Sequence, residues 1–181
     1  MAITSCQSKK ESSDEHQHHA EPADQAAVDT VKKSIPRETH AMIGSAHITI
    51  LYTAPNVRGR TIWGGLVPYD EVWVTGAHRA TSFEINKEFS MGGKNIPAGK
   101  YAIFTIPGKE KWIFIINKNW DQHLADDYNM SEDVVRVEVI PSTEDEIQER
   151  LTYSVVSKSD SEGTINMAWE KIRISVPIKI E

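Results

Sequence analysis

The sequence has one cysteine, Cys6, and no uninterrupted apolar run that could span a bilayer. A single cysteine excludes an internal disulfide and a paired-cysteine metal site, because each requires at least two sulfur atoms. A membrane-spanning helix needs roughly 20 apolar residues, so we expect membrane contact only through an anchor. The 26 acidic residues outnumber the 20 basic ones, and the net charge of −6 argues against a nucleic-acid partner.

The first 34 residues differ in composition from the rest of the chain. Residues 7–34 are rich in Ser, Glu, Asp, His and Lys and poor in large apolar side chains, which predicts a disordered polar tether. Ile3, Thr4 and Ser5 before Cys6 resemble a bacterial lipobox, which favours lipidation of Cys6 and a cell-envelope location, lipid-anchored or periplasmic. Only five residues precede Cys6, so we expect the signal to be truncated; an ordinary cysteine is the alternative.

The remaining residues, 35–181, have the apolar pattern of strands and predict one domain. From residue 47 onward apolar side chains recur at every second position, as in strands with one buried face. Residues 100–106 and 111–117 are apolar at odd and even positions alike, which predicts central strands covered on both sides. Residues 89–117 predict a strand meander, and residues 163–170 and 171–180 predict the last two strands. Only residues 121–128 and 142–150 leave room for a turn or two of helix. About nine or ten strands joined by turns predict an all-β fold, an antiparallel β-sandwich or jelly roll.

Several short motifs follow one another along this domain: Arg58-Gly59-Arg60, Tyr69-x3-Trp73-x-Thr75-Gly76, Pro97-Ala98-Gly99-Lys100-Tyr101 and Trp169-Glu170. Together and in this order they resemble an uncharacterised family of bacterial cell-envelope proteins of unknown function. The resemblance implies a β-rich fold and a secreted or lipid-anchored protein, and it implies no reaction. This chain departs from the usual family pattern at Val74, His78 and Arg79, where relatives more often have Arg, Asn and Glu.

The five tryptophans are the strongest aromatic candidates for ligand contact. Trp112 and Trp169 are in phase with the buried positions of their strands, so we predict that both belong to the core. Trp73 has an undecided face and Trp120 lies in a polar loop, which makes these two the candidates for a platform that stacks on a sugar ring.

The polar candidates gather near turns. His78 and Arg79 follow a glycine-containing turn, and His123 lies in a second polar loop. No motif supplies a nucleophile with a matched base, so we predict no catalytic residue, no metal site and no cofactor. A hydrolase that uses His78 or His123 with Asp126 or Asp127 is the alternative, and a structural protein-partner module is the third.

Glu149 is the one carboxylate that the period-two pattern places on an inward stripe. The same parity contains Ile147, Leu151 and Tyr153, so Glu149 would face the core and need a cationic partner. Arg58 or Arg60 could supply bidentate donors. The alternative is that the strand begins at Leu151 and that Glu149 lies at the solvent-exposed rim of the domain. The sequence thus predicts a non-catalytic module for a glycan or another polar ligand, with these candidate residues: Arg58, Arg60, Tyr69, Trp73, His78, Arg79, Trp120, His123 and Glu149.

Overall fold

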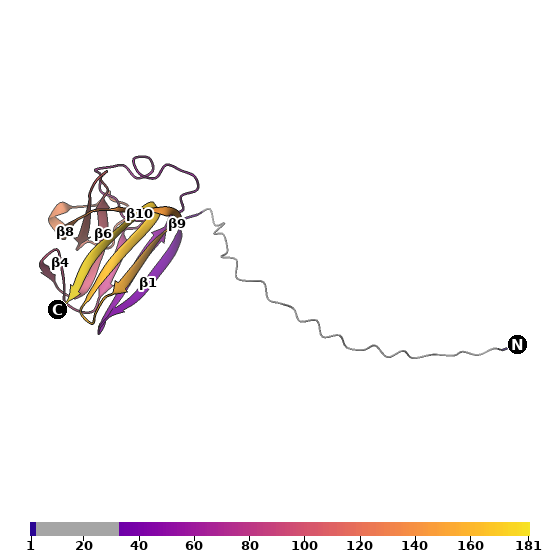
Figure 1. The fold of residues 1–181 in the computed structure, drawn as a ribbon, viewed down its shortest axis with the longest axis horizontal. Coiled ribbons are helices and arrows are strands. Elements are labelled where there is room, and N and C mark those ends of the chain that lie inside the picture. The colour runs from indigo at the N-terminus through magenta and orange to yellow at the C-terminus, as the bar shows by residue number, and fades with distance from the viewer. Residues whose placement is uncertain (3–32) are drawn as a thin grey trace. The chain divides into compact units, whose positions relative to one another are not determined.

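A computed structural model describes residues 1–2 and 33–181 of the chain (Figure 1). Cys6 and residues 7–32 of the predicted tether lie outside these residues, so lipidation remains a prediction. The described residues contain ten strands and one short 3-10 helix, η1 (Met130–Glu132). This confirms the predicted all-β fold. No helix in the described part of the chain is long and apolar enough to cross a membrane.

Six strands form the larger antiparallel sheet, in the order β1-β2-β3-β6-β7-β8. Their bounds are β1 (Ile35–Ile43), β2 (Ala46–Ala54), β3 (Thr81–Ile85), β6 (Gly99–Ile106), β7 (Trp112–Asn117) and β8 (Asp133–Val139). Each strand follows its sheet neighbour along the chain except β6, because β4 and β5 of the other sheet come between β3 and β6. The long segment between β2 and β3, residues 55–80, makes no strand and loops out at one end of the molecule (Figure 1).

Four strands form the second antiparallel sheet, in the order β5-β4-β10-β9. Their bounds are β4 (Phe89–Met91), β5 (Lys94–Ile96), β9 (Ser142–Ser157) and β10 (Glu162–Ile180). The long β9 and β10 run side by side, with β1 next to β9 (Figure 1). There the Thr39 hydroxyl donates to the carbonyl oxygen of Tyr153 at 3.0 Å, which links an edge of one sheet to an edge of the other.

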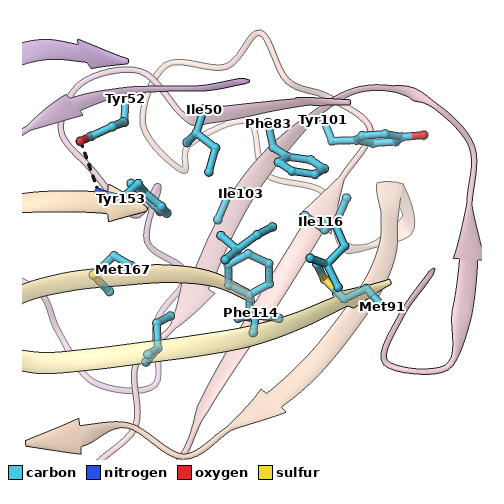
Figure 2. Close-up of a cluster of buried hydrophobic side chains, with 14 of the residues drawn as sticks. Ile50, Tyr52, Phe83, Met91, Tyr101, Ile103, Phe114, Ile116, Tyr153 and Met167 are labelled. Carbon is cyan, nitrogen blue, oxygen red and sulfur yellow. Dashed lines mark hydrogen bonds between the residues drawn. The ribbon is translucent and has the colours of Figure 1, made fainter. Parts of the chain in front are cut away.

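The main core lies between the two sheets. Figure 2 shows Ile50, Phe83, Ile103, Phe114 and Met167 gathered there, and all five are at most 1% exposed. The predicted alternation is confirmed for β2, β3 and β10, because the inward residues are buried while their neighbours are exposed or half-buried, except Ser82 and Thr164. Burying a large apolar side chain stabilises a fold by about 1.5–3 kcal/mol, so this layer is the main source of stability.

The structure corrects three expectations about the elements. Residues 142–150 belong to strand β9, and residues 121–128 form turns, so neither segment is helical. Residues 89–117 do not form one meander, because the β4–β5 hairpin pairs with β10 in the other sheet. The runs at 163–170 and 171–180 are one strand, β10, interrupted by register shifts on either side of Glu170.

Candidate functional site

A layer of irregular chain covers the outer face of β6 and β7. Residues 55–80 and 118–132 supply it, and a second apolar cluster is buried beneath, made of Val74, Ala80, Ala102, Phe104 and Ile115. This explains the two-sided apolar pattern of residues 100–106 and 111–117, since one face meets the main core and the other meets this layer. The predicted central strands are therefore confirmed, with loops rather than helices on their outer side.

A buried turn at Thr75 fixes the first part of the covering layer. Thr75 is 0% exposed and has a φ of 51°, a left-handed conformation that is unfavourable for a β-branched residue. Its hydroxyl lies 3.0 Å from the Thr105 hydroxyl, and its carbonyl accepts bonds from Thr81 at 2.9 Å and Tyr153 at 3.2 Å. Burial raises the pKa of the Tyr153 phenol well above its usual value, so this donor stays protonated.

Four of the tryptophans pack on one another at the inner side of this layer. The Trp63 ring contacts the rings of Trp73, Trp112 and Trp169 edge-on, with centroids 4.8–5.8 Å apart, and Trp73 stacks on Trp169 at 5.7 Å. Trp112 and Trp169 are each 1% exposed, which confirms that both are core residues. Trp73 is half-buried and donates its indole N–H to the carbonyl of Gly76 at 3.0 Å. Its ring is thus used for packing and not as an open platform.

A polar network fixes the second part of the layer, residues 118–132. Asn117 is 0% exposed and donates to Asp133 at 2.8 Å, while its side-chain oxygen accepts from the backbone of Asn119. The side-chain amide of the buried Gln122 donates to the Asn119 carbonyl, and the backbone carbonyl of Gln122 accepts from the Ala80 N–H at 3.0 Å. The two parts of the layer are therefore joined beside residue 80.

The tyrosine of this network is tightly bound. The Tyr128 hydroxyl donates to Asp133 at 2.6 Å and lies 3.2 Å from an Arg136 donor that also reaches Asp133 at 3.0 Å. Burial and the neighbouring Asp133 carboxylate raise the pKa of the Tyr128 phenol. These contacts hold the loop that carries Trp120 against the start of β8.

A groove of about 680 Å³ lies beside this layer on the outer face of the larger sheet, which is within the usual size range of small-ligand sites. We name it the Trp120 groove. Its floor comes from β2 and β3, where Leu51 and Ser82 are direct cross-strand partners. Its walls come from the start of β1, from Lys100 of β6, and from residues 79–80 and 120–121. Segments far apart in sequence thus meet around one hollow.

Trp120 is the aromatic member of the groove and is 41% exposed. The Lys100 ammonium lies 3.9 Å from the centroid of its ring, a cation–π contact. Leu51 on the floor is 39% exposed and adds apolar surface. An exposed indole beside an aliphatic side chain and cationic donors suits a ligand that has both apolar and polar faces.

Arg79 and Asp121 form an ion pair at the same wall. The guanidinium lies 2.5 Å from a carboxylate oxygen, and the two side chains are 69% and 59% exposed. Of the residues singled out from the sequence, the structure places Arg79 and Trp120 at this groove. Sequence reasoning missed Leu51, Ser82, Lys100 and Asp121; only Lys100, within the Pro-Ala-Gly-Lys-Tyr motif, carried any sequence signal.

The two candidate histidines lie next to the groove wall without lining it. Backbone bonds join their segments, since Arg79 and His123 form an isolated β-bridge and the Leu124 N–H donates to the His78 carbonyl at 2.6 Å. His78 and Leu124 both have positive φ values, 65° and 56°. Both imidazoles are exposed, and within residues 33–181 neither is hydrogen-bonded to a carboxylate. The structure therefore does not bring them together with Asp126 or Asp127 as a dyad.

Glu149 is half-buried and lies at the end of the sandwich near Arg58. One of its carboxylate oxygens accepts the backbone N–H of Arg58 at 2.8 Å. The Arg60 guanidinium donates to the backbone carbonyls of Asn56 at 2.5 Å and Val57 at 3.1 Å. The predicted inward stripe is wrong at Ile147, which is 56% exposed. The alternative strand start at Leu151 is also wrong, because β9 begins at Ser142.

Arg150 is the buried ionisable residue that the sequence did not reveal. It is 6% exposed and donates to the carbonyl of Ala54 at 3.0 Å and to that of Lys33 at 3.4 Å. Its strand is irregular here: Ala168 pairs with Thr152 and Glu170 with Gln148, so residues 149–151 lie opposite Trp169 alone. The two extra residues of this bulge interrupt the alternation, so that Arg150 and its neighbour Leu151 are both buried.

Tyr69 is half-buried and serves the covering layer. A Cβ atom at Gly64 would lie 2.8 Å from its ring, and Gly64 has a φ of 74°, so only glycine fits beneath the ring without strain. Tyr69 therefore packs on the loop and does not reach the Trp120 groove.

Two smaller hollows lie elsewhere on the described surface. One, of about 300 Å³, lies between the β4–β5 turn and the end of β10 and contains no aromatic side chain. The other, of about 360 Å³, lies along the irregular start of β9 and is mainly polar, with Glu144, Asp145 and Glu146 beside Lys171 and Arg173. Within residues 33–181 no cluster of His, Cys, Asp and Glu has the arrangement of a metal site. The Trp120 groove is the larger and the more aromatic hollow.

The fold and this groove belong to a β-rich module for which family comparison supplies no activity. Residues 34–178 match the family described as "Protein of unknown function (DUF2911)", and the chain belongs to that family. No curated protein and no solved structure matches the chain. The family membership agrees with the resemblance seen in the sequence, whereas the envelope location remains a prediction.

Proposed function

We propose that this protein is a non-catalytic binding module that takes a saccharide in the Trp120 groove. The observation that carries the proposal is the exposed Trp120 indole, which lies beside positively and negatively charged side chains in a groove of about 680 Å³. Pyranose rings have apolar C–H faces and polar hydroxyl edges, so they match an aromatic face bordered by hydrogen-bonding side chains. The residues around the groove supply binding groups rather than a nucleophile with a base.

Lys100 leaves the indole available to such a ligand. A cation–π contact at an exposed site stabilises by only about 0.5–1 kcal/mol, so a sugar ring can replace the ammonium or stack on the remaining exposed part of the ring. The displaced ammonium would then be free to donate to ligand hydroxyl groups.

Binding can be tested on the chain from residue 33 onward and on the full chain. A glycan array followed by calorimetric titration should identify saccharides whose affinity falls at least about tenfold in Trp120→Ala, because stacking on an aromatic ring contributes about 1–3 kcal/mol in comparable sites. Ile140→Ala is the control, since Ile140 is 85% exposed and does not line the groove. Hydrolysis of a bound saccharide by the wild type, or binding that is unaffected by Trp120→Ala, would contradict the proposal.

The envelope location is a separate part of the proposal. It is supported by the Ile3–Cys6 sequence alone, through its similarity to a lipobox. A saccharide-binding module held at the cell surface by lipid would meet polysaccharide ligands of the envelope. Detergent phase partitioning of a full precursor and of its Cys6→Ser variant tests it.

A further inference from the structure

The Arg79–Asp121 pair presents donors and acceptors side by side at the groove wall. One guanidinium nitrogen and one carboxylate oxygen are 2.5 Å apart, and both side chains are more than half exposed. A guanidinium has five N–H donors and a carboxylate about four acceptor sites, so this contact leaves most of both sets unused. The pair therefore offers a neighbouring donor and acceptor to a ligand in the groove.

Two adjacent hydroxyl groups of a sugar match this arrangement. Each hydroxyl donates one hydrogen bond and accepts others, so one can donate to Asp121 while its neighbour accepts from Arg79. Both bonds involve a charged partner, which makes them stronger than bonds between neutral groups. A single hydroxyl would satisfy only half of the pair, and a diol methylated at both oxygens would have no donor for Asp121.

The charges around the groove favour a neutral ligand. Lys100 and Arg79 are balanced by Asp121 and by Glu38, which itself lies 2.7 Å from His40. Arg37 also lines the groove and is exposed, so three cationic side chains there lie near two carboxylates, which is close to balance. A carboxylate on the ligand would approach Asp121 and Glu38, so the groove has no single-sign field that would select an acid.

We infer that the Trp120 groove recognises a neutral saccharide through two vicinal hydroxyl groups, with Arg79 and Asp121 as its specificity-determining residues. This inference rests on the proposed function and adds the class of saccharide and the residues that select it. Trp120 supplies stacking surface to any sugar ring, whereas the ion pair distinguishes a free vicinal diol from a blocked one.

The test uses four defined probes: maltotriose, mannotriose, galactotriose and trigalacturonic acid. At least one neutral trisaccharide should bind, and Arg79→Gln and Asp121→Asn should each weaken it about tenfold or more, as expected for a lost charge-assisted hydrogen bond. Methylation of the vicinal hydroxyls should have the same effect. Trigalacturonic acid should bind no more tightly than galactotriose.

Lys111→Gln and Glu138→Gln are the matched controls. That pair is also exposed, at 61% and 64%; Lys111 directly precedes β7 and Glu138 is on β8, and neither lines the groove, so the variants should bind like the wild type. Binding that needs Trp120 but not Arg79 or Asp121 would overturn the diol inference and leave the proposed function intact, as would a clear preference for the uronate. Failure of all four probes to bind would overturn both.

Discussion

Arg150→Met should be the most informative single change in the described fold. The arginine is 6% exposed and donates to the Ala54 carbonyl at the end of β2 and to the Lys33 carbonyl before β1. It thus connects β9 in one sheet to the first strands of the other. Methionine has a similar stem length, so the substitution removes the donors while leaving much of the packing.

The expected loss follows from these bonds. A hydrogen bond to a charged donor contributes about 1.5–3 kcal/mol, and a buried carbonyl left without its donor costs about 1–3 kcal/mol. The 3.0 Å bond to Ala54 is the stronger of the two, so we expect unfolding free energy to fall by about 2–4 kcal/mol in total. Arg150→Lys should lie between the two proteins, because lysine retains a charged donor without the planar fork.

Glu149→Gln is the matched comparison at the neighbouring position. Glu149 is half-buried, and a glutamine carbonyl can still accept the Arg58 N–H, so the loss should stay below about 1 kcal/mol. Denaturant unfolding with a common m value gives both numbers. A loss below about 1 kcal/mol for Arg150→Met, or a larger loss for Glu149→Gln, would refute this assignment of the buried donor.

Three further outcomes are expected. In a precursor that carries a complete signal, Cys6→Ser should move the protein from the detergent phase to the aqueous phase; unchanged partitioning would remove the lipid anchor. Gly163→Ala should destabilise by about 1–3 kcal/mol in thermal or denaturant unfolding, because its Cβ would lie 2.7 Å from the Val156 carbonyl oxygen. The Tyr153 pKa is raised on folding, so the folded state holds this proton more tightly; the resulting stability is complete below about pH 10 and is lost as pH rises further. Tyr153→Phe should therefore show a shallower decline in denaturation midpoint between about pH 10 and 11, and an identical decline would contradict this.

The core could be predicted because regular strands repeat every two residues. In β2 and β10 nothing interrupts that repeat over the stretches where Ile48, Ile50, Ile174 and Val176 are buried, so parity alone located them. The burial of β6 and β7 on both faces could be predicted in the same way, and so could the core positions of Trp112 and Trp169. Each of these inferences needs only local sequence.

The parity argument failed where β9 bulges. Residues 149–151 lie opposite one residue of β10, so alternation is interrupted there and two successive residues, Arg150 and Leu151, are both buried. Before the bulge, residues 142–148 are exposed at odd and even positions alike, so Ile147 is exposed although it has the same parity as Leu151. A bulge of this kind is set by the partner strand and by residues 55–57, which bond to the backbone of Glu149 and Leu151, and no local pattern in β9 encodes it.

The candidate site was only half predictable for a different reason. Trp120 and Arg79 stood out as a loop aromatic and a turn cation, but their neighbours in the groove come from β2, β3 and β6. Leu51 and Ser82 look like ordinary outward residues of two strands until the register places them opposite each other. The groove is a product of sheet order, which sequence periodicity does not specify.

Binding and stability should be largely separable in this fold, because they depend on opposite faces of the larger sheet. The main core lies on the inner face, whereas Arg79, Asp121 and Trp120 are exposed on the outer face. The exception is Gln122, which is buried. Its backbone carbonyl accepts the Ala80 N–H, so it joins the two segments that carry the groove wall. Its side chain reaches Asn117 and Asn119, which ties that wall to the end of β7. The position of the groove residues therefore depends on a buried polar network, while their chemistry remains free to vary without disturbing the core.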